Sequence, residues 1–96
     1  MKNNFKTIIQ GSIELLEYKI TKKYPKIDTS DLMLVMPKLT ANMPPIYRSV
    51  FTGFYWRKMS INDLQKNHGL KESEVESILD SATEIFMTMY KDSHKK

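Results

Sequence analysis

Residues 59–90 carry two amphipathic helical patterns that are separated by a single glycine, Gly69. Leu64 stands before this glycine, and Leu70 and Val75 follow it at spacings that bring the three side chains into one small apolar kernel. Glycine takes the positive φ that a helix end often requires, because it has no Cβ to clash. The segment therefore predicts a helix-turn-helix, in which two short helices cross steeply around a tight turn.

The rest of the chain also reads as helices. Apolar residues recur at helical spacing, and prolines or capping residues separate the runs. We predict an all-α fold of about five helices in a single domain. Its parts are N-terminal helices in 1–42, a helix-turn-helix with a long final helix in 43–91, and a frayed tail in 92–96. The first expected helix carries Phe5, Ile9, Ile13, Leu16 and Ile20 and ends at Tyr24-Pro25. The second spans 32–39, and the third starts at Pro44-Pro45. The fourth spans 61–68 after a Ser60–Asp63 capping box, and the fifth runs from about Glu74 to about Lys91.

The final helix carries the longest apolar stripe. Its start is expected at a capping box formed by Ser73 and Glu76. Such a stripe has to be buried, and we expect it to pack on the first helix of the same domain. A homodimer or partner interface is the alternative. The stripe consists of Val75, Ile78, Ala82, Ile85 and Met89, which step by three and four residues.

Composition limits what the chain can do. Its 96 residues suffice for one modest core but not for a large enclosed active site. The absence of cysteine excludes disulfides, thiol nucleophiles and thiolate metal sites. No apolar run approaches the ~20 residues of a membrane span, and the polar residues near the N-terminus argue against a signal peptide. We therefore expect a cytoplasmic protein with no membrane partner.

Catalysis is the least favoured interpretation. The sequence has no glycine-rich phosphate loop, no metal-ligand cluster and no nucleophile motif. Its two histidines, His68 and His94, stand on different segments. We expect no enzyme activity, no cofactor and no metal ion.

The charge of the second helix of the motif conflicts with the reading of duplex DNA. The net charge is +4, but residues 1–48 hold eight basic and four acidic residues, whereas residues 49–96 hold seven of each. The basic excess therefore lies outside the helix-turn-helix, and Lys19, Lys22, Lys23 and Lys26 form half of the basic residues in that first part. Duplex DNA carries about one negative charge per ~1.7 Å, so an acidic helix is repelled from it. The acidic residues are Glu72, Glu74, Glu76, Asp80 and Glu84.

About half of the chain, residues 43–90, resembles region 4 of bacterial sigma factors. A similar architecture with a long final helix occurs in small phage transcription activators of the ArpU and RinA type. In these families a proline-led helix with tyrosine and arginine precedes a helix-turn-helix. The segments that carry the resemblance are Met43 to Phe51, Phe54 to Trp56, Met59 to Leu64, Gly69-Leu70 and Glu74 to Leu79.

The resemblance implies a regulator of transcription that acts through DNA, RNA polymerase or both. Base-facing positions of the motif map to Lys71, Glu72, Ser73, Glu76 and Ser77. A carboxylate in such a position can accept from a cytosine amino group. The nucleic-acid-binding residues predicted in this interpretation are Arg57, Lys58, Lys66, Lys71, Ser73 and Ser77.

The second interpretation is a protein-interaction module, either an inhibitor or an adaptor. Its acidic helix-turn-helix would bind a sigma factor, a polymerase subunit or another transcription regulator instead of DNA. Complementary charge would steer the encounter, and aromatic residues would anchor it. The predicted protein-binding residues are Tyr47, Tyr55, Trp56, Glu74, Glu76 and Asp80.

Overall fold

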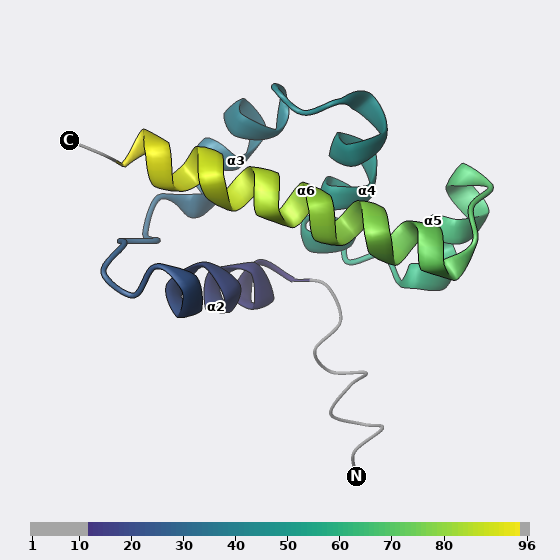
Figure 1. Cartoon of the computed structure of the whole chain (residues 1–96), viewed down its shortest axis with the longest axis horizontal. Coiled ribbons are helices and arrows are strands. Elements are labelled where there is room, and N and C mark those ends of the chain that lie inside the picture. Colours follow the sequence, from purple (N-terminus) through teal and green to yellow (C-terminus); the bar gives the residue numbers. More distant parts are fainter. Residues whose placement is uncertain (1–11, 95–96) are drawn as a thin grey trace, which may run out of the picture.

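The computed structural model describes residues 12–94, which form five helices and no strand. The long helix α6 runs across the whole molecule in Figure 1, with α2 along one side, α3 and α4 on the other and α5 beside its N-terminal end. This confirms the predicted all-α single domain. The predicted first helix is described only from Ile13 onward, and Phe5 and Ile9 lie outside the described residues. The helices are α2 (Ile13–Lys23), α3 (Leu32–Thr40), α4 (Pro45–Tyr55), α5 (Ile61–His68) and α6 (Glu72–Ser93).

Local capping signals set the starts of α2, α4 and α5. The hydroxyl of Ser12 accepts from the backbone N–H of Leu15 at 3.1 Å and starts α2. Pro45 occupies the first turn of α4, where the missing N–H costs no helical bond. The predicted capping box at α5 is present: the Ser60 hydroxyl accepts from Asp63 N at 3.0 Å, and Ser60 N donates back to the Asp63 carboxylate at 3.2 Å.

The start of α6 differs from the prediction. The helix begins at Glu72, and the Glu74 carboxylate accepts from the backbone N–H of Lys71 at 2.8 Å. The predicted Ser73–Glu76 box is therefore wrong by two residues, and the sequence rule could not indicate the observed start because the N-cap residue is Lys71 and not Ser or Thr. A carboxylate in the first turn also complements the positive end of the helix dipole. Glu74 thus has a structural function in starting the helix.

The core is centred on the contact between α4 and α6. Phe51 stacks on Phe86 with ring centroids 4.8 Å apart, and both side chains are fully buried. Tyr90 continues the aromatic row at 6.0 Å from Phe86. Of the predicted stripe, Val75 and Ala82 are fully buried, but Ile78, Ile85 and Met89 are only partly buried; the other buried apolar residues of α6 are Leu79, Phe86, Met87 and Tyr90. The contacts of α6 are mainly with α4, not with the first helix as expected. The prediction missed this because a stripe defines a face of a helix and not the element that covers it.

Tyr55 belongs to the core. Its side chain is 0% exposed, and its hydroxyl lies 3.1 Å from the Thr83 hydroxyl, which is also buried. The prediction that Tyr55 anchors a protein partner is therefore wrong for this structure. Tyr55 lies on the face of α4 that α6 covers, and the hydrogen bond with Thr83 gives its buried hydroxyl a partner.

The C-terminal end of α6 is fastened to the loop before α3. The Tyr90 hydroxyl donates to Asp31 Oδ1 at 2.7 Å and lies 2.9 Å from the backbone oxygen of Asp28. His94 Nε2 lies 3.1 Å from both carboxylate oxygens of Asp31, and its Nδ1 lies 2.9 Å from the Tyr90 backbone oxygen. The predicted frayed tail is wrong for residues 92–94, since α6 continues to Ser93. Residues 95 and 96 lie outside the described residues.

These contacts between Tyr90, His94 and Asp31 make the free energy of unfolding depend on pH. The Tyr90 backbone oxygen, and next the Asp31 carboxylate, raise the pKa of His94 above 6.5. The Tyr90 hydroxyl, and next His94, lower the pKa of Asp31 below 3.8. Burial, with a smaller effect from Asp31, raises the pKa of Tyr90. A raised histidine pKa stabilises the fold below about pH 6.5 and loses this effect as the pH rises through the folded-state pKa. The lowered Asp31 pKa stabilises it above about pH 3.8.

We therefore expect His94→Gln to lower the free energy of unfolding more at pH 5.5 than at pH 8.5. Urea unfolding of both proteins at the two pH values measures the difference. In an Asp31→Asn background the pH-dependent part of this effect should shrink, because the carboxylate that interacts with protonated His94 is gone. An equal loss at both pH values would show that His94 contributes no charged interaction.

Removal of the central aromatic contact should destabilise the domain strongly. Phe86→Ala is expected to lower the free energy of unfolding by about 3–5 kcal/mol, because it leaves a cavity against Phe51. Thr88→Ala, on the exposed side of the same helix, should change it by less than about 1 kcal/mol. Chemical unfolding followed by circular dichroism measures both. Equal effects of the two substitutions would contradict the central place of this contact.

Candidate functional site

The predicted helix-turn-helix is present as α5, a three-residue turn and α6. Gly69 ends α5 with φ of 63°, in the left-handed region where glycine is strongly favoured. Leu64 and Val75 are both fully buried, and Leu70 packs against the same core. A Cβ on Gly53 would lie 2.9 Å from Leu64 Cδ2, so α4 and α5 are in close contact at this point. The motif is thus packed rigidly on α4.

The outer side of α6 carries an acidic face, which we define as Glu72, Glu76 and Asp80. These exposed carboxylates recur every fourth residue and extend over about 12 Å of helix. Like charges at this spacing repel each other by about 0.2–0.5 kcal/mol per pair. None of the three forms an ion pair within residues 12–94. The repulsion within the acidic face therefore opposes folding, and no ion pair within the described residues offsets it.

Two further acidic residues of α6, Glu74 and Glu84, have structural partners. Glu84 forms an ion pair with Lys23 of α2 at 2.6 Å, and Glu74 caps the start of α6. Glu74 was predicted as a protein-binding residue, and its carboxylate is exposed as well as used in the cap. It remains accessible to a partner, but a substitution there also disturbs the helix start.

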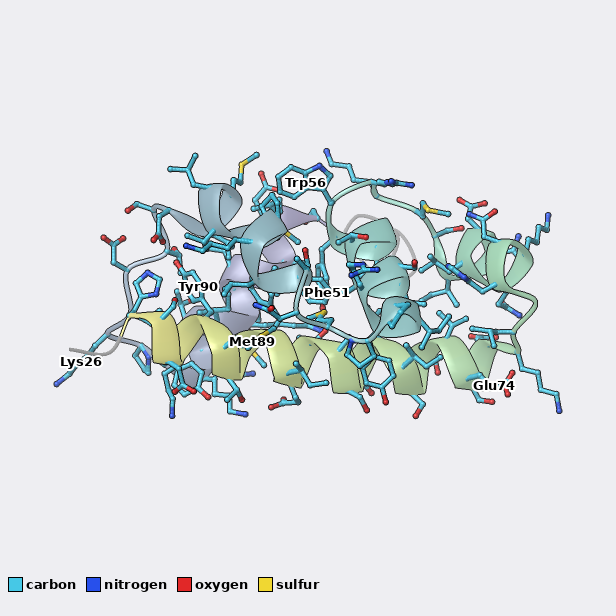
Figure 2. All side chains as sticks on the ribbon, turned by 90° about the horizontal axis from the view of Figure 1, so that it is seen from above. Lys26, Phe51, Trp56, Glu74, Met89 and Tyr90 are labelled. Carbon is cyan, nitrogen blue, oxygen red and sulfur yellow. The ribbon has the colours of Figure 1, made fainter. Side chains whose placement is uncertain are left out.

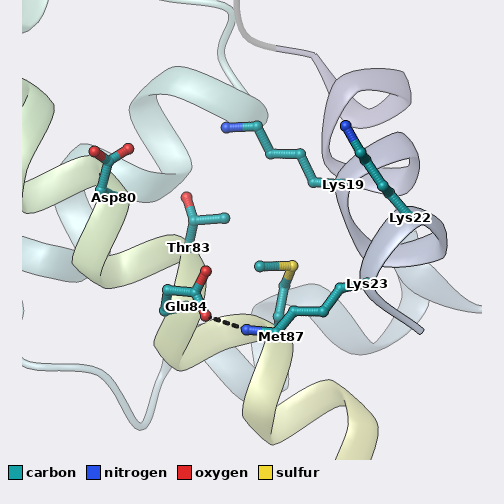
Figure 3. A pocket seen from close by; sticks show the side chains of 7 residues that line it. All are labelled: Lys19, Lys22, Lys23, Asp80, Thr83, Glu84 and Met87. Carbon is teal, nitrogen blue, oxygen red and sulfur yellow. Dashed lines mark hydrogen bonds and ion pairs between the residues drawn. The ribbon is translucent and has the colours of Figure 1, made fainter.

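Three lysines at the end of α2 face α6 across an open cleft of about 450 Å³ (Figure 3). They are Lys19, Lys22 and Lys23. Lys23 pairs with Glu84 there, and Asp80 lies on the opposite wall of the cleft. Lys19 Nζ lies 5.8 Å from the centre of the Tyr55 ring, and Lys22 Nζ lies at the same distance from the Tyr18 ring. Part of the basic excess of the N-terminal half is therefore engaged within the domain.

The residues predicted to bind nucleic acid are all on the surface. Arg57 and Lys58 form the turn between α4 and α5, and Lys58 takes a positive φ of 59°. The others lie on α5 and at the start of α6. No ion pair within the described residues neutralises any of the basic ones. Exposed are Arg57, Lys58, Lys66, Lys71, Ser73 and Ser77.

The predicted aromatic anchors do not share a surface with the acidic face. Figure 2 shows Trp56 on the side of the molecule away from α6, whereas Glu74 lies on α6. The Trp56 side chain is 42% exposed, and Tyr47 is partly buried against the core. The six predicted protein-binding residues therefore do not form one surface. Tyr55 is in the core and Tyr47 is partly buried, Trp56 is on the side away from α6, and α6 carries Glu74, Glu76 and Asp80.

The side that carries Trp56 is hollowed, which sequence reasoning missed. A hollow of about 470 Å³ lies between α3 and α4, and a second of about 270 Å³ continues toward the end of α5. Both are bordered by Ser49, Thr52 and Arg57. The spacing Arg48, Thr52, Trp56 places one side chain per helical turn on this face, which is the sequence signal that points to it.

Two further findings concern the described residues as a group. No three histidine or acidic side chains among them converge on a position that could hold a metal ion. None of the described helices is long and apolar enough to cross a membrane.

The repulsion along the acidic face is measurable. Glu76→Lys removes two like-charge pairs and places a lysine four residues after Glu72 and four before Asp80. We expect it to raise the free energy of unfolding by about 0.8–2 kcal/mol at low salt, because two repulsive pairs become attractive, with the gain shrinking in 1 M NaCl. Glu76→Gln should give roughly half of the gain. Destabilisation by both substitutions would mean that Glu76 has a favourable contact inside the fold.

A scan against protein-family models finds no match, and searches of curated proteins and of solved structures find no significant match to this chain.

Proposed function

We propose that this protein is a non-enzymatic regulator of transcription of bacterial or phage type. We further propose that it acts mainly by contact with RNA polymerase, a sigma factor or another transcription regulator. The observation that carries this proposal is the acidic face on the helix that would read DNA. Glu72, Glu76 and Asp80 are exposed, closely spaced and without an ion-pair partner in residues 12–94.

The physical argument rests on the cost of this face. Three carboxylates at the surface of one helix are stable in water, but they meet phosphate charge unfavourably in a DNA groove. Against a basic protein surface the same carboxylates raise the rate of encounter and favour one orientation. The packed helix-turn-helix holds them in a fixed array, because Leu64 and Val75 lock α5 to α6. Such an array suits a partner that normally binds nucleic acid or another acidic surface.

Direct binding of duplex DNA is the second candidate. It is favoured by the exposure of Arg57, Lys58, Lys66 and Lys71 around the motif. These cations would contact phosphates, while Ser73 and Ser77 would reach base edges from α6. With the acidic face beside them, we expect this binding to be weak and steeply dependent on salt.

The proposal is tested with labelled protein and purified bacterial core RNA polymerase, the sigma factor alone, and random-sequence duplex DNA. We expect saturable binding to a protein component at physiological salt. A variant with Glu76→Lys and Asp80→Asn should weaken that binding at least about tenfold while it keeps its helicity. Asp80 is only neutralised, because it borders the lysine cleft. Glu74 is kept because it caps α6.

The matched control changes Glu14 to Lys and Asp92 to Asn, which alters the net charge equally at two exposed positions away from the acidic face. Its binding should stay within about twofold of the unmodified protein if position, and not total charge, decides the interaction. Nanomolar sequence-specific binding of duplex DNA by the isolated chain in physiological salt would overturn the proposal and favour the second candidate. So would unchanged protein binding by the acidic-face variant.

A further inference from the structure

We propose that the hollowed face of α4 is a binding groove for single-stranded nucleic acid, with Trp56 stacking on a base and Arg48 and Arg57 holding the backbone. We call this surface the α4 groove and define it by Arg48, Ser49, Thr52, Trp56 and Arg57. It lies away from the acidic face of α6 and does not depend on the proposed function.

The shape of the α4 groove suits a strand. The hollow between α3 and α4 measures about 470 Å³, and the adjoining one toward α5 about 270 Å³. Because Ser49, Thr52 and Arg57 border both, the two hollows form a continuous path along α4. Asn67 and His68 stand at the α5 end of this path and add polar groups to its wall. Together the two hollows offer room for a strand to lie along α4.

The charge of the groove selects an anion. Among the described residues that border the two hollows there is no carboxylate, and the only charged ones are Arg48 and Arg57. Neither guanidinium forms an ion pair within residues 12–94. Arg48 Nη1 has only a long contact of 3.5 Å to the backbone oxygen of Ala41. Guanidinium groups bind phosphate oxygens with two parallel hydrogen bonds, so both are available for a backbone.

Trp56 supplies the second requirement of strand recognition, which is an accessible aromatic face. Trp56 is 42% exposed although tryptophan is usually largely buried. It borders the same hollow as both arginines. Exposed aromatic side chains interleaved with cations are the usual means of holding unpaired bases, because every base has a face that can stack.

Stacking distinguishes a single strand from the other anionic ligands. In a duplex the bases are already stacked on each other, so Trp56 would contribute little. A free mononucleotide would fill only part of the path and use one phosphate. The single strand is the ligand that uses both arginines and the indole ring together.

The test uses Trp56 as its own reporter, since it is the only tryptophan of the chain. The full chain is titrated with a 12-nucleotide oligothymidine, and intrinsic fluorescence is recorded. We expect saturable quenching that weakens steeply between 50 and 200 mM salt. A 12-base-pair duplex, thymidine monophosphate and inorganic phosphate should each bind at least about tenfold more weakly. Equal quenching by the duplex or by the monophosphate would overturn the proposal, and so would the absence of quenching by the oligonucleotide.

Variants locate the binding by fluorescence anisotropy of a labelled oligonucleotide. Trp56→Ala should weaken affinity by about tenfold or more, whereas Trp56→Phe should retain most of it. Arg57→Gln and Arg48→Gln should each weaken it severalfold. Lys91→Gln removes the same charge at an exposed position of α6 outside both hollows and should stay near the unmodified value. Circular dichroism checks that each variant is folded. An equal loss in Lys91→Gln and Arg57→Gln would mean that net charge alone binds the strand, and would overturn the assignment of the strand to the α4 groove.

The acidic-face variant separates this proposal from the proposed function. Glu76→Lys with Asp80→Asn changes residues that border neither hollow. It should therefore lose protein binding and keep strand quenching. Loss of Trp56 quenching in that variant, with the fold intact, would contradict the assignment of the strand to the α4 groove.

Discussion

The stack of Phe86 on Phe51 is the interaction on which the other features of this domain depend. It holds α6 against α4, and α4 in turn holds α5 through the close approach of Gly53 to Leu64. The helix-turn-helix is therefore not an isolated pair of helices but one edge of a core that α4 organises. Since α4 is covered by α6 on one side, its opposite side is left to form a surface. The acidic face and the α4 groove are consequences of the same packing.

Features set by neighbouring residues could be predicted from the sequence. The Ser60–Asp63 capping box, the left-handed Gly69 and the first-turn Pro45 depend on contacts within a few residues, and the structure has all three. Features set by distant residues could not. Tyr55 was assigned to a surface because aromatic residues serve both cores and interfaces, and only the position of Thr83 on α6 decides between them. His94 was assigned to a frayed tail because its partner, Asp31, lies 63 residues away.

The candidate site shows the same division. The acidic residues of α6 could be identified by their spacing, because the helical period alone places Glu72, Glu76 and Asp80 along one side. The α4 groove could not be identified in this way, because residues of three helices border it. Its first hollow is bordered by α3 as well as α4, and its second hollow reaches α5. The basic excess of the N-terminal half is not all available at the surface, because Lys23 is paired with Glu84 across the cleft in Figure 3. Charge counted along a chain describes a surface only after the fold has paired some of it.

The separation of charge over the two sides of the domain has a consequence for binding. The Debye length at physiological salt is about 8 Å, so a cation on the α4 groove is largely screened from the carboxylates on the far side of the molecule. An anionic strand and a basic protein would then bind to opposite sides with little mutual repulsion. They would also contribute to each other's local concentration, because one folded domain holds both. If both proposals hold, such a domain would join two ligands of opposite charge, and neither surface would need to change shape for the other to be occupied.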